Sequence, residues 1–161
     1  MFVNFSQTLT VAATQQDAWN LLRDPKRMAN LLPNIESIAE GDSQEKFLAH
    51  VVERVGPFRL SLNLEVKIVD AAEPSLLQAE LTGTDSRGQN RLSGTIRADL
   101  KEDSTSGTLI SMDSSVEVTG ALTTLGAAPI RRRANEVFAQ FAARLQGQFL
   151  PQKGTKITNE A

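Results

Sequence analysis

The sequence predicts an α+β fold in which a curved antiparallel sheet of seven strands wraps around a long C-terminal helix. Apolar and polar side chains alternate with period two from Phe58 to Ile68, as in a strand with one buried face. The same alternation returns in other segments joined by short connections, which favours antiparallel neighbours. A helical apolar stripe runs from Leu122 to Gln148 and matches the single core of such a sheet.

The opening of the chain is expected to form one strand and two short helices. Residues 3–11 alternate between apolar and polar side chains, which is typical of a strand. Thr14 and Asp17 form a capping pair that predicts a helix start. Asp24-Pro25 breaks this helix, and a second short helix ends before Pro33. Later strands are expected at residues 35–40, 45–55, 58–68, 77–81, 92–100 and 110–118, with a polar loop at 83–88.

The last element is predicted to be a helix from Leu122 to Gln148, about 40 Å long at about 1.5 Å per residue. Pro129 falls inside this pattern, so either a kink or a late helix start near residue 129 is expected. We expect a single domain over residues 1–148 and a flexible polar tail over 149–161.

Composition excludes several classes of function. Lys and Arg total 17 against 19 Asp and Glu, a net charge of −2, so a nucleic-acid partner is not expected. The chain has no cysteine, which excludes thiol chemistry. Its one histidine, His50, cannot supply a multi-histidine cluster, and no metal site is assigned. Without a basic, apolar leader or a long apolar run, we expect a cytoplasmic protein.

Three segments carry a family resemblance: VAATQQDAWNLLRDPKRMANLLPNIESI, VVERVGPFRLSLNLEV and GALTTLGAAPIRRRANEVFAQFAARL. With the order of the elements, they resemble the START-like helix-grip superfamily (polyketide cyclase/Bet v 1-like). Within it the chain is similar to the carbon monoxide dehydrogenase G-subunit family, through its D-P-x-x-(M/L), L-P and V-G-P elements. The resemblance covers residues 2 to about 147. It implies a tunnel between helix and sheet, and a molybdenum-containing, carbon monoxide dehydrogenase-like oxidoreductase as partner.

The inward faces suggest a lipophilic ligand, a quinone or a lipid, held without a covalent bond. Inward leucines usually fill a core, but the implied tunnel and several small inward residues favour open space. The small residues are Ala49, Ala79, Gly94, Ala98, Gly126 and Ala134. The expected lining is Leu32, Phe47, Val51, Leu60, Leu62, Leu64, Leu81, Leu92, Met112, Leu125, Ile130, Ala134 and Phe138.

The polar candidates are few, and no catalytic residue is assigned. Glu53 lies on the apolar side of its strand; burial alone would disfavour its charged form, which makes it the best acid candidate. We favour instead a pairing with Arg54 or Arg59. His50 is expected to point outward as a surface or rim residue, not to serve as a general base.

The run Arg131-Arg132-Arg133 is expected to form a solvated face. A second interpretation places one arginine at the cavity mouth, or against an acidic partner or an anionic lipid head group. Ser114, Ser61 or one of these arginines could donate a hydrogen bond to a quinone carbonyl.

Three functions stay open. The first is a non-enzymatic carrier of a lipophilic molecule, accessory to the molybdenum oxidoreductase. The second is a cyclase- or hydrolase-type enzyme using Glu53. The third is an assembly factor that grips its partner through the long helix or the short helices around Met28 to Leu32. Met28, Leu31 and Leu32 could also touch a bilayer, which would make the protein peripheral at the inner face of the membrane.

Overall fold

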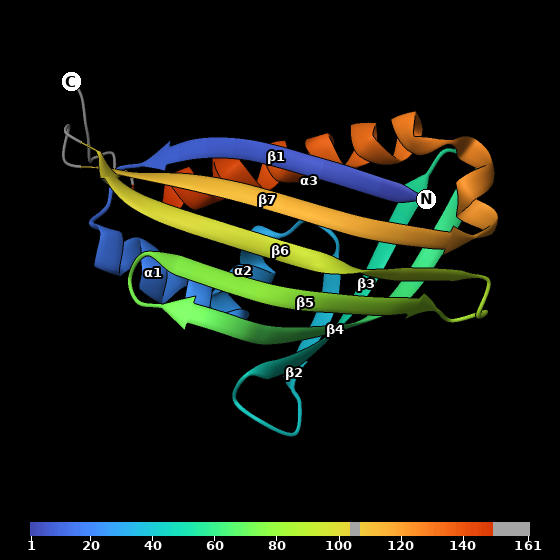
Figure 1. Cartoon of the computed structure of the whole chain (residues 1–161), viewed down its shortest axis with the longest axis horizontal. Coiled ribbons are helices and arrows are strands. Elements are labelled where there is room, and N and C mark those ends of the chain that lie inside the picture. The colour runs from blue at the N-terminus through green and yellow to red at the C-terminus, as the bar shows by residue number, and fades with distance from the viewer. Residues whose placement is uncertain (104–106, 150–161) are drawn as a thin grey trace.

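The computed structural model, which describes residues 1–103 and 107–149, contains one seven-stranded antiparallel sheet with the order β1-β7-β6-β5-β4-β3-β2 (Figure 1). This confirms the predicted fold class. The strands are β1 (Phe2–Val11), β2 (Ile35–Glu40), β3 (Lys46–Val55), β4 (Phe58–Ala72), β5 (Leu76–Asp85), β6 (Asn90–Asp103) and β7 (Gly107–Gly120).

Two short helices, α1 (Gln15–Arg23) and α2 (Pro25–Leu31), follow β1 as expected. The Thr14 hydroxyl accepts a hydrogen bond from the Asp17 backbone N–H at 3.1 Å, which caps α1. The Asp24 carboxylate caps α2 in the same way, and Pro25 occupies the first turn, where its missing N–H costs nothing.

The C-terminal helix starts later than residue 122. A 3-10 turn, η1 (Ala121–Leu125), ends at Gly126, whose φ of 77° suits glycine, and α3 (Ala127–Gln148) begins there. Pro129 therefore lies in the first turn, where no backbone N–H is needed. This confirms the late start, one of the two outcomes that Pro129 predicted.

Several strands run further than the sequence suggested, among them β6 and β7, which each extend by two or three residues at both ends. β5 continues through Gly83 to Asp85, so the predicted loop at 83–88 was wrong for its first three residues. Gly83 pairs with Leu64 and Leu92, and these ladder bonds override its turn propensity. β4 continues past Ile68 to Ala72 through a shift in register. Of the predicted tail, only Phe149 is described; it packs on the core, and residues 150–161 lie outside the described residues.

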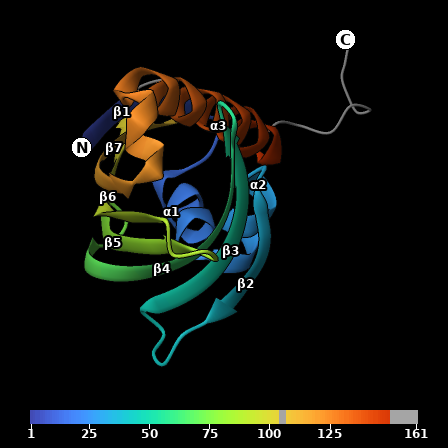
Figure 2. The same cartoon turned by 90° about the vertical axis from the view of Figure 1, so that its right-hand side faces the viewer.

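The sheet curls around α1 and α2, and α3 lies across its open side (Figure 2). Gly94 marks a point where β6 and β7 come unusually close. A Cβ added there would lie 2.1 Å from the Ser115 carbonyl oxygen. The missing side chain at residue 94 thus serves the close approach of two strands and not, as predicted, open space.

The buried side chains form two separate clusters on the concave side. The helix-end cluster joins α1, α2 and the C-terminal half of α3 to the sheet, and consists of Leu9, Val11, Ala13, Ala18, Trp19, Leu21, Leu22, Leu31, Ala98, Leu100, Ile110, Phe141 and Leu145. The η1-end cluster consists of Val3, Ala49, Val51, Val55, Leu60, Leu62, Val118 and Leu122. The middle of the concave side belongs to neither.

Candidate functional site

The middle of the concave side is apolar but only partly buried. Along β6, Ala98 and Leu100 belong to the helix-end cluster and Leu92 packs on the η1-end cluster, while Gly94 and Ile96 lie between them, partly exposed. Their cross-strand neighbours on the same face are also partly exposed. We call this group the central patch: Val66, Ala79, Leu81, Gly94, Ile96 and Ser114.

The position of α3 explains this exposure. The helix packs chiefly along β1, and makes smaller contacts with β3, α2 and η1. Phe138 of α3 packs against Phe5 of β1 with ring centroids 5.3 Å apart and ring planes tilted by 57°, which holds the helix over that edge of the sheet. The central patch lies on β4 to β7, on the side of the sheet that α3 faces.

The predicted lining residues divide among these regions. Leu81 belongs to the central patch, and Ala134 is partly exposed on α3. Partly buried residues that pack on the clusters are Leu32, Leu64, Leu92, Met112, Leu125, Ile130 and Phe138. Buried residues are Phe47, Val51, Leu60 and Leu62. The prediction missed Val66 and Ile96, although their alternation along the strands marks the same face, and it named Ala79 only as a small inward residue.

Glu53 is held by partners that the sequence did not suggest. Its carboxylate accepts hydrogen bonds from Arg133 Nε of α3 at 2.5 Å and from the Asn34 side chain. The expected pairing with Arg54 or Arg59 was wrong: Arg54 contributes only its backbone N–H, at 2.9 Å. Because Glu53 is not buried alone, the observation that made it an acid candidate does not hold.

Arg133 is the one arginine of its run that faces the sheet. The hydrogen bond to Glu53 raises the pKa of Arg133 above its ordinary value, against the opposing effect of burial, and a second bond to Glu136 adds to it. Arg131 and Arg132 are exposed, as a solvated face requires. Arg133 thus bridges α3 and β3 beside the concave side.

One predicted contact surface is occupied by the protein itself, and one predicted hydrogen-bond donor lies on the other face of the sheet. Leu31 is 3% exposed within the helix-end cluster, and Met28 and Leu32 pack against that cluster, so these three side chains do not form the exposed bilayer contact that was suggested. Ser61 points away from the concave side and cannot donate to a ligand there, whereas Ser114 lies in the central patch. Within residues 1–103 and 107–149, no helix is both long and apolar enough to cross a membrane.

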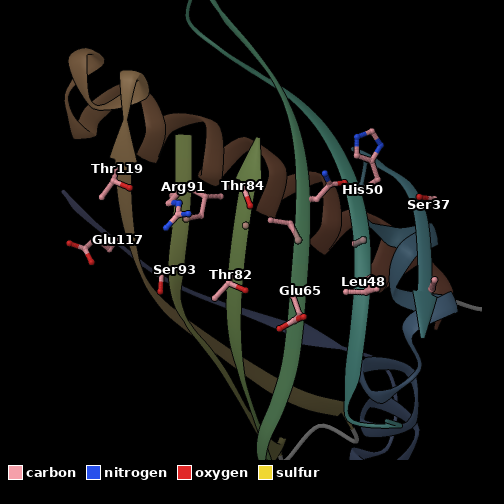
Figure 3. A pocket seen from close by; sticks show the side chains of 16 residues that line it. Ser37, Leu48, His50, Glu65, Thr82, Thr84, Arg91, Ser93, Glu117 and Thr119 are labelled. Carbon is pink, nitrogen blue, oxygen red and sulfur yellow. The ribbon is translucent and has the colours of Figure 1, made fainter. Parts of the chain in front are cut away.

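A hollow of about 850 Å³ lies on the opposite, outer face of the sheet (Figure 3). Two rows of side chains across the strands supply most of its lining, and all of them but Leu48 are polar: Ser37, His50, Asn63, Thr84, Arg91 and Thr119 in one, and Leu48, Glu65, Thr82, Ser93 and Glu117 in the other. A smaller hollow of about 300 Å³ lies between α2 and β2. Neither includes a central-patch residue, so the tunnel under α3 stays a prediction.

His50 points to this outer face, as the sequence predicted. Its ring nitrogens lie 2.9 Å from Glu36 Oε1 and 2.7 Å from Ser61 Oγ. Among the described residues, no cluster of three or more His, Cys, Asp and Glu side chains could hold a metal ion.

Solved structures share this fold at low sequence identity. A conserved protein from Geobacillus kaustophilus is 17% identical with a TM-score of 0.82, covering 91% of this chain and 95% of that one. A START superfamily protein from Mycobacterium smegmatis is 17% identical with a TM-score of 0.65, covering 91% and 96%. Truncated norcoclaurine synthase from Thalictrum flavum is 14% identical with a TM-score of 0.66, covering 95% and 96%.

These similarities establish a START-like, Bet v 1-like helix-grip fold. A search of curated proteins gives no match. The family model for the G subunit of carbon monoxide dehydrogenase (CoxG) matches residues 8–149, which include all three main helices and all but the first residues of the sheet. The chain therefore belongs to the carbon monoxide dehydrogenase G-subunit (CoxG) family.

Proposed function

We propose that this chain is a non-enzymatic binding protein that holds a lipophilic molecule against the central patch, between the sheet and α3. The observation that carries the proposal is the partial exposure of these apolar side chains between two buried clusters. Covering apolar surface is worth about 25 cal/mol per Å². A ligand with an apolar body would gain this energy at the patch.

The ligand we favour is a quinone or a lipid. A quinone ring and its tail are apolar, and its carbonyls need few donors. The Ser114 hydroxyl offers one donor within the patch. We propose a carbon monoxide dehydrogenase-like molybdenum oxidoreductase as the enzyme that this carrier serves, because the family description names a carbon monoxide dehydrogenase.

Native mass spectrometry of the gently purified protein tests the proposal. A stoichiometric bound isoprenoid or acyl species, identified after organic extraction, is the expected result. Ala134→Phe should reduce the occupied fraction, because Ala134 is partly buried on α3 and a phenyl ring there takes the space beside the patch. Ala139→Phe is the matched control, since Ala139 is exposed on the same helix.

A clean apo mass that persists after incubation with ubiquinone, menaquinone and phospholipid would contradict the carrier proposal. Equal ligand occupancy in Ala134→Phe and in the wild-type protein would indicate that the ligand does not bind beside α3. Capture of the oxidoreductase by an apo protein, undiminished by Ala134→Phe, would favour the assembly-factor hypothesis instead.

A further inference from the structure

Three polar side chains on the outer face form a hydrogen-bonded relay across neighbouring strands. Glu36 of β2 lies 2.9 Å from His50 Nδ1, and Ser61 Oγ of β4 lies 2.7 Å from His50 Nε2. Because a carboxylate only accepts hydrogen bonds, we assign the ring proton to Nδ1, which donates to Glu36. Nε2 is then free to accept the proton of the Ser61 hydroxyl.

We propose that Ser61 is a nucleophile toward small carboxylic esters, with His50 as its general base and Glu36 as the residue that positions the imidazole. A serine within hydrogen-bond distance of a histidine that a third group orients is the geometry of nucleophilic acyl transfer. The relay lies on the sheet face opposite the central patch. The proposal is therefore independent of the lipophilic ligand.

The sheet holds this relay on a rigid support. Ser61 stands between Leu60 and Leu62, which are each 5% exposed on the concave side, so the alternation of β4 fixes Ser61 on the outer face. His50 pairs directly with Asn63 in the β3–β4 ladder, one diagonal step from Ser61. Sites built on strands keep their geometry better than sites on loops.

The relay is open to a substrate. The side chains of His50 and Glu36 are 32% and 58% exposed. His50 (Figure 3) and Asn63 line the outer hollow of about 850 Å³, so the hollow begins beside the relay and gives the rest of an ester room. Its hydroxyl-rich lining favours an ester with a polar remainder.

Two side chains can stabilise the oxyanion that forms when the ester is attacked. Arg59 and Asn63 lie two residues before and after Ser61, on the same face and about 7 Å away along the strand. Both carry N–H donors on side chains long enough to reach a carbonyl at Ser61. A donor that reaches the oxyanion is worth about 100-fold or more in rate.

The reaction balances without any further reagent. As Ser61 Oγ bonds to the ester carbonyl carbon, its proton moves to His50 Nε2. Collapse of the tetrahedral intermediate breaks the bond to the leaving alkoxide, which takes that proton from His50 and departs as an alcohol. Water then repeats the two steps on the acyl-serine and releases the carboxylic acid.

Acylation by 4-nitrophenyl acetate tests the proposal. We expect a burst of nitrophenolate and an acetyl group on Ser61, mapped by peptide mass spectrometry. His50→Gln should lower the rate of Ser61 acetylation about 100-fold, which is typical for loss of a general base. Glu36→Ala should lower it less, and Glu36→Gln should restore part of the rate because its amide oxygen still accepts from Nδ1.

Ser115→Ala is the matched control, because Ser115 is exposed on the outer face away from the relay; its rate should equal the wild-type rate. The thermal midpoint of each variant checks that it folds, since outer-face substitutions should leave that midpoint almost unchanged. An acetyl group found only on lysines would overturn the proposal, as would His50→Gln labelling Ser61 at the wild-type rate. The amount of lipid bound to Ser61→Ala tests the proposed ligand site on the concave side independently of the acylation.

Discussion

Removing the Arg133 guanidinium tests whether its ion pair with Glu53 fastens α3 to β3. The two residues lie 80 positions apart, and their side chains join the helix to the far half of the sheet. Because α3 packs chiefly along β1, this ion pair is a main contact that holds the helix to β3 in the opposite half of the sheet. Arg133→Met keeps most of the aliphatic stem and removes the charge.

The exposure of the two side chains sets the expected magnitude. Breaking a fully buried pair costs about 3–5 kcal/mol, and breaking an exposed one about 0–1 kcal/mol. Arg133 is 28% exposed and Glu53 is 12% exposed, so solvent screens the pair in part. We therefore expect a loss of about 1–2 kcal/mol of unfolding free energy, with a fall in Tm of about 2–4 °C per kcal/mol.

Urea unfolding of Arg133→Met, Glu53→Gln and the double variant measures the coupling directly. The double variant should be less destabilised than the sum of the single variants by about 1 kcal/mol. Arg132→Met, an exposed neighbour in the same helix, should change stability by about 0.5 kcal/mol at most. Additive effects, within about 0.3 kcal/mol, would refute the role of the pair as a fastening.

Three further predictions concern the stability of the sheet and its ends. The hydroxyl of fully buried Thr108 donates to the Ala13 carbonyl at 2.8 Å; Thr108→Val should cost about 1–3 kcal/mol in urea unfolding, because that carbonyl loses its donor. Leu145 is 0% exposed in the helix-end cluster, so Leu145→Ala should cost about 2–5 kcal/mol by calorimetry, against little change for the exposed Ala143→Ser. The pKa of Asp85 lies below its ordinary value of 3.8, because burial, which raises it, is outweighed by hydrogen bonds from the Asn90 side chain and from neighbouring backbone N–H groups. Asp85 therefore stabilises the fold above pH 3.8 and loses this effect as the pH falls through the lowered pKa, so Asp85→Asn should shrink the difference between unfolding free energies at about pH 7 and about pH 3.

The alternation of side chains predicted the sheet well because its cause is local. Successive residues of a strand point to opposite faces, so Leu60 and Leu62 had to share a side whatever the partner strands were. The short connections then made the order β3 to β7 a simple meander. The end of β5 was missed because Gly83 and its polar neighbours have turn propensity, and only pairing with β4 and β6 keeps them extended.

The polar contacts could not be predicted because they depend on long-range placement. The choice of Arg133 as the partner of Glu53 depends on where α3 crosses β3, which no local pattern encodes. The relay through His50 requires the registers of β2 with β3 and of β3 with β4 together. Parity alone placed His50 outward, but it could not show which acceptor and which hydroxyl would reach the ring.

The exposure of the central patch has the same origin. Ile96 and Ala98 lie on the same face of β6 and have similar neighbours in the sequence. Ala98 is nevertheless 5% exposed, whereas Ile96 is only partly buried. The difference arises because α1 packs onto β6 near its end while α3 packs along β1. The packing of the helices therefore decides where open space remains beneath α3. The sequence of the strand that lines this space does not decide it.

The two proposed sites use alternate residues of the same strands, which makes their tests separable. On β4, Leu62 faces the concave side and Ser61 faces the outer side of the sheet; on β3, Val51 and His50 divide in the same way. A shift of one residue in the pairing register would turn the side chains of each face to the opposite face. The buried side chains on β3 and β4 oppose such a shift. Ser61→Ala removes one partly exposed oxygen and leaves the buried side chains of the concave side in place, so loss of acylation with unchanged lipid occupancy would identify chemistry on the outer face. Loss of both together would instead indicate a damaged sheet, and the thermal midpoint of the variant would then fall with them.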